Sequence, residues 1–317
     1  METSKGFRIF ICVALLVTSA QTNAVDLLFA DHPLAGKIWD MRNHSFIKES
    51  VLLSSTNQAD VLLLGETHDN PVHHKNQLRL YKAKIASGHL PALMMEQLNA
   101  DDQQALDWTL SGESSEETLE RASRLIRFSD LHAYQPFLAT AIENRLPVIA
   151  ANISTQRSQP VIWNGFAAYD ADELKHLVVE KVWSEARQKF LVENMGGAHC
   201  GKLRDELREG LTRGQRLRDA LMVDSAISSV GRSVVGIVGS SHARWDIGLP
   251  LYFAARAPEA RIITVGFLEV SPGLTSPDVY EADSATGELP YDFVWFTPRV
   301  DRVNPCANLL EPIGGQP

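Results

Sequence analysis

Five short and almost unbroken apolar runs constrain the fold of this chain more than any other feature. They are Val61–Leu64, Ala92–Met95, Val148–Ala151, Val234–Val238 and Arg261–Gly266. Continuous apolar runs of this length are typical of strands buried on both faces of a parallel sheet, whereas a half-exposed strand alternates apolar and polar residues. The runs therefore predict a central parallel sheet.

Longer amphipathic stretches separate these runs and are typical of helices. They are Val72–Ser87, Asp101–Leu110, Ser115–Ile126, Tyr134–Asn144, Asp172–Asn194 and Lys202–Val230. The alternation of strand and helix indicates an α/β domain with a mostly parallel central sheet flanked by helices. The last two stretches have no strand between them, and the segment MGGAHCG, with three glycines, breaks them apart. We expect a helical insertion at about residues 172–230, over one edge of the sheet.

The first 24 residues have the layout of a secretory signal peptide. Lys5 and Arg8 precede the apolar run IFICVALLV, and small and polar residues follow it. We predict cleavage after Ala24, with Ala20 as the competing site and an uncleaved membrane anchor as the alternative. Cys12 lacks the small residues of a lipoprotein signal before it. The expected location is therefore export to the periplasm without a lipid anchor.

The mature chain then divides into three parts. An N-terminal segment covers residues 25–57, the α/β domain covers residues 58–270, and a Pro-, Gly- and Asp-rich extension with one strand at Asp292–Phe296 covers residues 271–317. We expect the extension to pack on the domain. Cleavage leaves Cys200 and Cys306, which either pair as one disulfide or stay free. The formal net charge of −9 argues against a nucleic-acid partner, because phosphate binding needs a basic surface.

Polar and titratable side chains follow four of the predicted strands directly. In an open parallel sheet, ligands bind outside the carboxyl ends of the strands, so these side chains are expected to converge on one rim. They are Glu66, Thr67, His68 and Asp69 after the first strand, Glu96 and Gln97 after the second, Asn152 and Arg157 after the third, and Ser240, Ser241 and His242 after the fourth.

Two of these strand ends share the form Gly-x-x-His, in GETH and GSSH. His68 and His242, with Glu66 or Glu96, would make a metal site of the His and carboxylate type. Without metal, the same groups would serve as a general base and its orienting carboxylate. The structural alternative is that each His bonds only its own loop.

At these residues the sequence resembles the ChaN family of bacterial haem-associated, iron-regulated proteins in the Tiki superfamily. The resemblance runs from about Val61 to Gly266. Its motifs are LLLGETHDNPVHH, ALMMEQ, the Tyr-x-Pro of AYQPFL leading into LPVIAAN, AHCG, QRLRDALM and GIVGSSHARWDIGLP. AHCG and the QRLRD helix are the more specific pieces.

The resemblance implies two different functions. In the Tiki proteases and erythromycin esterases of the superfamily, histidines and glutamates at such strand ends belong to a hydrolase. On that basis Glu66, His68, Glu96 and His242 would be catalytic or hold a divalent metal such as Mn, Co or Zn, with Arg218 and Asp219 in support. ChaN itself is linked to haem binding at a dimer interface through a tyrosine ligand.

Several residues are candidates for a haem site. Phenolate suits ferric haem, and a nearby Arg or His helps it to ionise. Tyr134 matches a family-like position, with a tyrosine packed at a helix start as the alternative. His199 and Cys200 are a second candidate pair, with a buried turn as the alternative. Trp245, just past GSSH, would wall an apolar pocket or pack in the core. His73 and His74 face different sides of a helix, so at most one joins the rim.

We therefore predict an exported ChaN-like protein that binds haem or iron and assists its acquisition. The expected partners are haem or iron species, a second copy of the chain in a homodimer, and an outer-membrane haem receptor system. The alternative is a metal-dependent peptidase or esterase that uses the Gly-x-x-His pair and the glutamates at the sheet rim.

Overall fold

The structure is a computed structural model, and it describes residues 26–112, 115–127, 131–198, 203–281, 284–285 and 290–302. Within these residues an eight-stranded sheet has the order β3-β2-β9-β8-β4-β7-β5-β6. Its strands are β2 (Ile38–Asp40), β3 (Ser45–Ile47), β4 (Val61–Glu66), β5 (Ala92–Asn99), β6 (Val148–Asn152), β7 (Val234–Gly239), β8 (Ile262–Glu269) and β9 (Phe293–Thr297). β1 (Leu27–Leu28) and β10 (Arg299–Val300) form a separate antiparallel pair.

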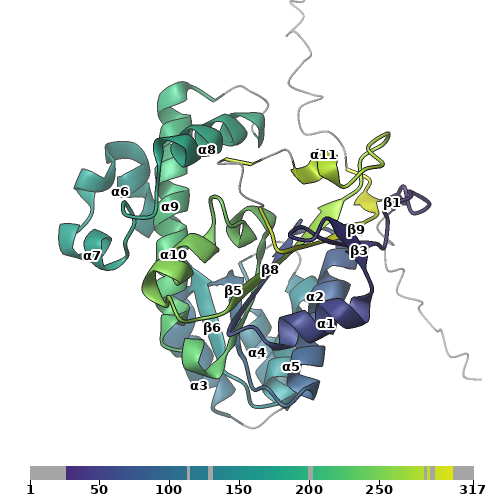
Figure 1. Ribbon diagram of the computed structural model, residues 1–317. Coiled ribbons are helices and arrows are strands. Elements are labelled where there is room, and N and C mark those ends of the chain that lie inside the picture. Colours follow the sequence, from purple (N-terminus) through teal and green to yellow (C-terminus); the bar gives the residue numbers. More distant parts are fainter. Residues whose placement is uncertain are drawn as a thin grey trace, which may run out of the picture.

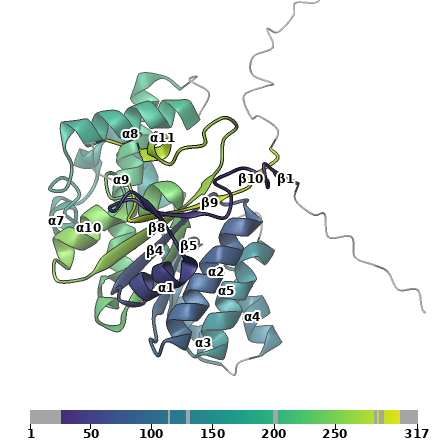
Figure 2. The same cartoon turned by 45° about the vertical axis from the view of Figure 1, so that its right-hand side comes forward.

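Helices cover both faces of the sheet, as Figures 1 and 2 show. One face carries α1 (Glu49–Asn57), α2 (Pro71–Ala86), α3 (Gln103–Leu110), α4 (Glu116–Ser123) and α5 (Leu131–Glu143). On the other side lie α6 (Thr155–Asn164), α7 (Ala171–His176), α8 (Glu185–Ala198), α9 (Asp205–Ile227) and α10 (Leu249–Arg256). The shorter elements are the 3₁₀ turns η1 (Ala100–Asp102), η2 (Phe166–Ala168), η3 (Val230–Arg232) and η4 (Ser240–Ala243), and the helix α11 (Asp278–Glu281).

The first strand of the parallel sheet shows why its apolar run is unbroken. Val61 and Leu63 belong to the core on the α9 side, whereas Leu62 and Leu64 belong to the core on the α2 side. All four side chains are fully buried. Each contributes about 1.5–3 kcal/mol by burial, so a polar residue at any of them would be costly on either face.

The predicted mixed α/β fold is confirmed, and all five apolar runs are strands. β4 pairs in parallel with β7 and β8, β5 with β6 and β7, and β8 with β9. The strand predicted at Asp292–Phe296 is β9. Within the predicted insertion, the first amphipathic stretch divides into α7 and α8. The long helix α9 packs against β6, the strand at one edge of the sheet.

The sheet also contains strands that the sequence pattern did not indicate. β2 pairs antiparallel with both β9 and β3, so this end of the sheet is not parallel. The segment at residues 25–57 thus contributes two strands and α1 to the domain. α6 and α10 were not predicted either.

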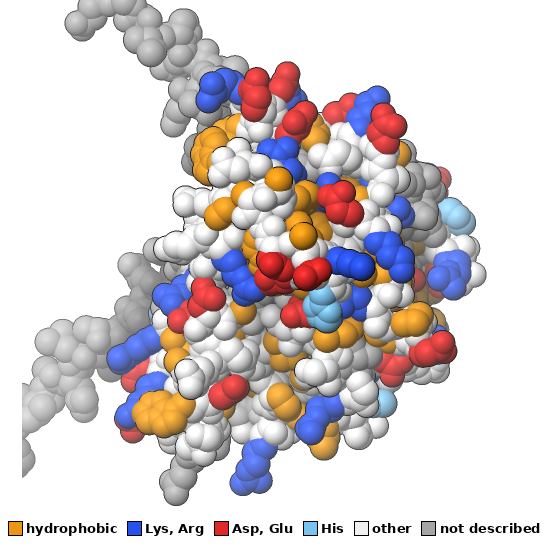
Figure 3. Space-filling model, turned by 90° about the vertical axis from the view of Figure 1, so that its left-hand side faces the viewer, with side chains coloured by type: hydrophobic (Ala, Val, Ile, Leu, Met, Phe, Trp, Pro, Cys, Tyr) orange, Lys and Arg blue, Asp and Glu red, His pale blue; other side chains and the backbone are white. Residues whose placement is uncertain are grey.

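Several predicted features fall outside the described residues. The signal peptide, His199, Cys200 and Cys306 all do, so the cleavage site and the disulfide stay predictions. In the part of the chain that is described, no helix has the length and apolar character needed to cross a membrane. Figure 3 shows the side of the molecule that carries α6 and α7, where acidic and basic side chains are interspersed with apolar ones.

Candidate functional site

The parallel register brings the carboxyl ends of β4, β5 and β7 to one rim of the sheet. Glu66, the last residue of β4, lies opposite Gly239, the last residue of β7. Glu96 comes from the neighbouring β5, and His242 lies in η4 immediately after β7. Three strand ends that are far apart in the sequence therefore place two carboxylates and an imidazole side by side, as the sequence predicted.

Glu66 is the centre of one half of this site, and its side chain is buried. Its Oε1 accepts hydrogen bonds from the Tyr134 hydroxyl at 2.6 Å and from Gln97 Nε2 at 3.1 Å. His68 Nδ1 lies 2.9 Å from the same oxygen, and His74 Nε2 lies 3.2 Å from Oε2. Burial raises the pKa of the Glu66 carboxyl, but the hydrogen bonds and charges of the two histidines outweigh it and hold the pKa at about 2.

His242 is the centre of the other half. Its Nδ1 bonds a carboxylate oxygen of Asp219 on α9, and its Nε2 lies 3.3 Å from Glu96 Oε1. The backbone N–H of Gly239 donates to Glu96 Oε2 at 2.6 Å. Burial lowers the pKa of His242, but the two carboxylates outweigh it and raise the pKa to about 10. The imidazole is therefore held as a cation between Glu96 and Asp219.

His68 joins the two halves and is the member that reaches solvent. Its Nε2 lies 3.9 Å from Glu96 Oε1, and 38% of its side chain is exposed, against 5% for His242. Burial lowers the pKa of His68, but the Glu66 hydrogen bond and the Glu96 charge raise it above its usual value. Buried carboxylates thus orient a single exposed imidazole.

Two glycines make room for this arrangement. A Cβ on Gly239 would lie 2.9 Å from His68 Nε2, and one on Gly248 would lie 2.3 Å from the His242 carbonyl oxygen. Both distances are shorter than real Cβ contacts, so a side chain at either position would displace a histidine of the site.

Comparison with known proteins places the chain in a family. A family model described as haem-binding uptake, Tiki superfamily, ChaN matches residues 52–253. The chain belongs to this family. A comparison with curated proteins found no match. All the strand ends of the candidate site lie inside the range that the ChaN-family model matches.

One of the solved structures compared shares the fold, and two others are more distantly similar. ChaN of Campylobacter jejuni, solved with cofacial haem binding, is 20% identical, with a TM-score of 0.65 over 81% of this chain and 95% of that one. A Bacillus cereus protein has 13% identity and a TM-score of 0.40, over 77% of this chain and 72% of its own. An erythromycin esterase mutant in an open conformation has 11% identity and a TM-score of 0.37, over 85% of this chain and 98% of its own.

Some of the residues predicted for the site lie elsewhere in this ChaN-family chain. Arg218 donates to Gln215 Oε1 at 3.4 Å, and Gln215 in turn lies 3.1 Å from His242 Nδ1. Gln215 thus lies between Arg218 and His242. Arg157 bonds Glu173, a residue of α7, at 3.0 Å. Trp245 donates its indole N–H to Asp292 at 2.9 Å, which fixes it against the C-terminal segment.

Of the two adjacent histidines, one joins the site, as their helical spacing allows. His74 approaches Glu66. His73 is fully buried, accepts a hydrogen bond from the Thr67 N–H at Nδ1 (2.8 Å), and lies with Nε2 2.7 Å from Thr297 Oγ1. Burial lowers the pKa of His73 to about 4, so it is neutral at physiological pH.

A divalent metal site is not supported. In the described residues, no group of three or more His, Cys, Asp or Glu side chains is arranged to hold a metal ion. The predicted set was Glu66, His68, Glu96 and His242. Their contacts explain the result, because each carboxylate pairs with a histidine or with a backbone or side-chain donor. The arrangement suits proton transfer at His68, with Glu66 as its orienting carboxylate.

The sequence did not indicate the contacts that hold the GETHDNP loop in place. Arg302, beyond β10, bonds Asp69 with its guanidinium and also donates to Glu269 at 2.6 and 2.7 Å. Asn70 Nδ2 donates to Glu269 Oε1 at 2.7 Å and to the Pro298 carbonyl at 3.0 Å. The segment Thr297–Arg302, which we call the C-terminal strap, therefore fastens the loop that carries Glu66 and His68.

Proposed function

We propose that this chain is an exported haem-binding protein that assists haem or iron acquisition. The observation that carries the proposal is the match to the ChaN haem-binding uptake family over residues 52–253. The shared fold with ChaN of Campylobacter jejuni, over 95% of that chain, supports it.

A ferric haem ligand has to be a side chain that the iron can reach. All six tyrosines lie in the described residues, and Tyr81, Tyr134, Tyr252 and Tyr291 are buried. Tyr134, the tyrosine favoured by sequence position, is 1% exposed and donates to Glu66. Burial and the Glu66 charge both raise its pKa, which opposes the phenolate that iron needs. To bind haem it would have to leave Glu66.

The half-buried tyrosines are Tyr169 and Tyr280, and we place the iron ligand at Tyr169. Its hydroxyl donates to Glu173 Oε1 at 2.9 Å, and Arg157 Nη2 bonds the same oxygen at 3.0 Å. Partial burial raises the pKa of Tyr169, and the Glu173 hydrogen bond and charge add to the rise, whereas the Arg157 hydrogen bond and charge oppose it. Among the described residues, no such cation is a main cause of the pKa shift at Tyr134. Arg157 is thus placed to stabilise a phenolate at Tyr169.

The segment before Tyr169 also offers apolar surface of the kind that a macrocycle covers. Trp163 at the end of α6 is 63% exposed, and Phe166 in η2 is half-buried against the core. These aromatic side chains offer a surface against which the face of a haem would pack. The residues of this chain therefore fit haem, with Tyr169 as iron ligand and Arg157 as its support. Bound haem would supply redox-active iron for transport. His199 and Cys200 stay candidates for a second ligand.

The experiment is a haem titration of the mature protein, followed by absorbance. We expect a saturable Soret band that Tyr169→Phe abolishes. Tyr280→Phe is the matched control at the other half-buried tyrosine, and Tyr134→Phe tests the buried one. A Soret band lost only in Tyr134→Phe would move the ligand there. No saturable band in the wild type would overturn the proposal.

Export through residues 1–24, a homodimer and an outer-membrane receptor system belong to the same proposal. Absence of the protein from a periplasmic extract would contradict export. Should haem fail to bind while a hydrolytic activity disappears on His68→Ala, the exposed imidazole would instead mark the hydrolase of the alternative reading.

A further inference from the structure

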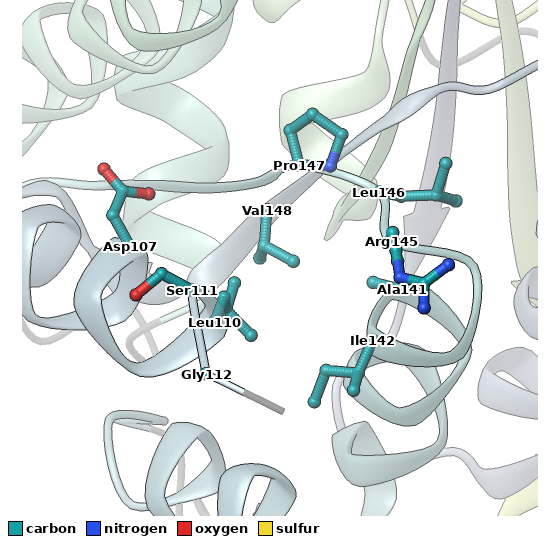
Figure 4. Close-up of a pocket in the computed structure, with 10 residues that line it drawn as sticks. All are labelled: Asp107, Leu110, Ser111, Gly112, Ala141, Ile142, Arg145, Leu146, Pro147 and Val148. Carbon is teal, nitrogen blue, oxygen red and sulfur yellow. The ribbon is translucent and has the colours of Figure 1, made fainter. Parts of the chain in front are cut away.

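A pocket of about 460 Å³ lies at the opposite end of the sheet from the candidate site. It opens between the C-terminal ends of α3 and α5, beside Val148, the first residue of β6 (Figure 4). Its volume is in the range of small-molecule sites. The glutamates and histidines of the rim take no part in it.

The floor of this pocket is apolar. Leu146 and Val148 are buried, and Leu110 and Ile142 are partly exposed to the opening. Two charged side chains stand on opposite sides of it, Asp107 from α3 and Arg145 from the loop after α5, as Figure 4 shows. An apolar floor with a few fixed polar groups is the usual composition of a ligand site.

Arg145 has an unusual backbone for its residue type. The Arg145 N–H bonds the Ile142 carbonyl and the Leu146 N–H bonds the Ala141 carbonyl, which closes α5 with a Schellman motif. Its φ is 50°, a left-handed conformation for which glycine is the favoured residue at this position. The chain instead carries an exposed arginine there, at a cost in stability.

The guanidinium of Arg145 makes no hydrogen bond or ion pair with any residue that the structure describes. An exposed cation beside an apolar floor, without a partner among the described residues, suits a carboxylate on a ligand. Across the pocket, Gln103 Nε2 donates to one Asp107 oxygen at 2.8 Å and leaves the carboxylate charge in place. Asp107 therefore disfavours a second negative charge at the far end of the ligand.

We propose that this pocket binds a small monocarboxylic acid with an apolar body, its carboxylate at Arg145 and its apolar part on Leu110, Leu146 and Val148. This site is independent of the haem-binding function proposed above.

The test is calorimetric titration of the full mature protein with sodium decanoate and with sodium decanedioate, a dianion of equal chain length. We expect saturable decanoate binding that weakens about tenfold or more in both Arg145→Gly and Arg145→Gln, and that Arg145→Lys largely keeps. Arg145→Gly should also raise the melting temperature, because it relieves the left-handed strain, so lost binding cannot be ascribed to unfolding. Arg299→Gln, at an exposed arginine near the other end of the molecule, should bind as the wild type does.

The dianion tests the orientation of the acid in the pocket. Decanedioate should bind more weakly than decanoate in the wild type, and Asp107→Asn should narrow that difference. Haem titration of Arg145→Gly should match the wild type. Decanoate binding that is unchanged in Arg145→Gly and Arg145→Gln, or no saturable binding at all, would overturn the proposal.

Discussion

The hydroxyl of Tyr134 donates a 2.6 Å hydrogen bond to Oε1 of Glu66, across 68 residues of sequence. Both side chains are buried. The phenol thus helps to keep an anion inside the protein, where an unpaired carboxylate would be costly. Because the Glu66 charge in turn raises the pKa of Tyr134, the pair is stable only with the proton on the phenol.

Tyr134→Phe removes this donor and leaves Glu66 with one hydrogen bond fewer. Gln97 and His68 still contact the same oxygen, so we expect the free energy of unfolding to fall by about 1–3 kcal/mol, the contribution of one hydrogen bond to a charged group. Urea unfolding measures it. Tyr81→Phe is the matched control, because the Tyr81 hydroxyl is buried and has no hydrogen-bond partner among the described residues. That change should be neutral or stabilising, and equal losses in the two variants would contradict the role of the Tyr134 bond.

Gly239→Ala tests how closely the rim is packed around His68. The added Cβ would meet His68 Nε2 at 2.9 Å, and His68 is exposed enough to swing outward. We expect the pKa of His68, now raised by Glu66 and Glu96, to move back toward 6.5. NMR titration of the imidazole measures this. Gly231→Ala is the control, since a Cβ there has open space. An unchanged His68 pKa in Gly239→Ala would show that the added Cβ does not displace the His68 ring.

Much of this fold follows from the sequence because one physical rule governs it. A strand buried on both faces has to be apolar throughout, so runs such as Val61–Leu64 and Val234–Val238 are visible without any structure. Parallel strands then send their polar ends to one rim, which is why Glu66, Glu96 and His242 could be grouped correctly.

The elements that were missed lack such a signal. β2 and β3 are three residues each, too short to show alternation. α6 contains Pro160, which argues against a helix when only the sequence is read. Their structure depends on tertiary packing, which a local pattern does not encode.

Partners within the site were also hidden. Asp219 was predicted to support the site, but that it bonds His242 depends on which face of α9 meets η4. The C-terminal strap carries no recognisable motif and lies outside the range of the family match. Contacts such as Arg302 with Asp69 exist only because β9 and β10 run past the GETHDNP loop.

Arg302→Gln tests the strap. Arg302 bonds both Asp69 and Glu269, and charge-assisted bonds of this kind are about twice as strong as neutral ones. Part of the cluster is exposed, so we expect a loss of only about 1–2 kcal/mol in the free energy of unfolding. Hydrogen exchange should also speed up in residues 67–70. Arg299→Gln, three residues earlier and exposed, should change neither quantity. Equal effects of the two variants would rule out a specific role of Arg302 in holding the loop.

His73 predicts how stability falls in acid. Its folded-state pKa is about 4, below the ordinary value of 6.5, so the unfolded chain takes up a proton first as the pH falls. The contribution of the neutral His73 to the free energy of unfolding is fully present above pH 6.5. It is lost between pH 6.5 and about pH 4, by roughly 3 kcal/mol in total. Glu66 and Glu96 have pKa values lowered to about 2, so protonation of these carboxylates reduces the stability further only below pH 4.5.

Urea unfolding from pH 7 to 4.5 covers this range, and a His73 variant separates the contribution of His73 from those of His68 and His242. His73→Asn, which keeps an acceptor for the Thr67 N–H, should flatten the curve in this window even though it starts from a lower stability. Exposed His89→Asn is the control and should leave the slope as it is. A slope that persists in His73→Asn would mean that another group takes up the proton.

His242 predicts the opposite behaviour in alkali. Its folded-state pKa is about 10, above 6.5, so its contribution is complete below pH 6.5 and is lost as the pH rises through about 10. Asp219→Asn removes one of the two carboxylates that hold the cation, so the pKa of His242 falls. The alkaline loss still begins near pH 6.5, but it is smaller and ends at lower pH. Unfolding free energies measured from pH 7 to 10 should show the displaced curve. Asp224→Asn is the control, an acid on the same helix that pairs with Arg256 at the surface. If Asp219→Asn and Asp224→Asn leave the alkaline curve equally unchanged, His242 is not held as a cation by Asp219, and the charge on the buried half of the site lies elsewhere.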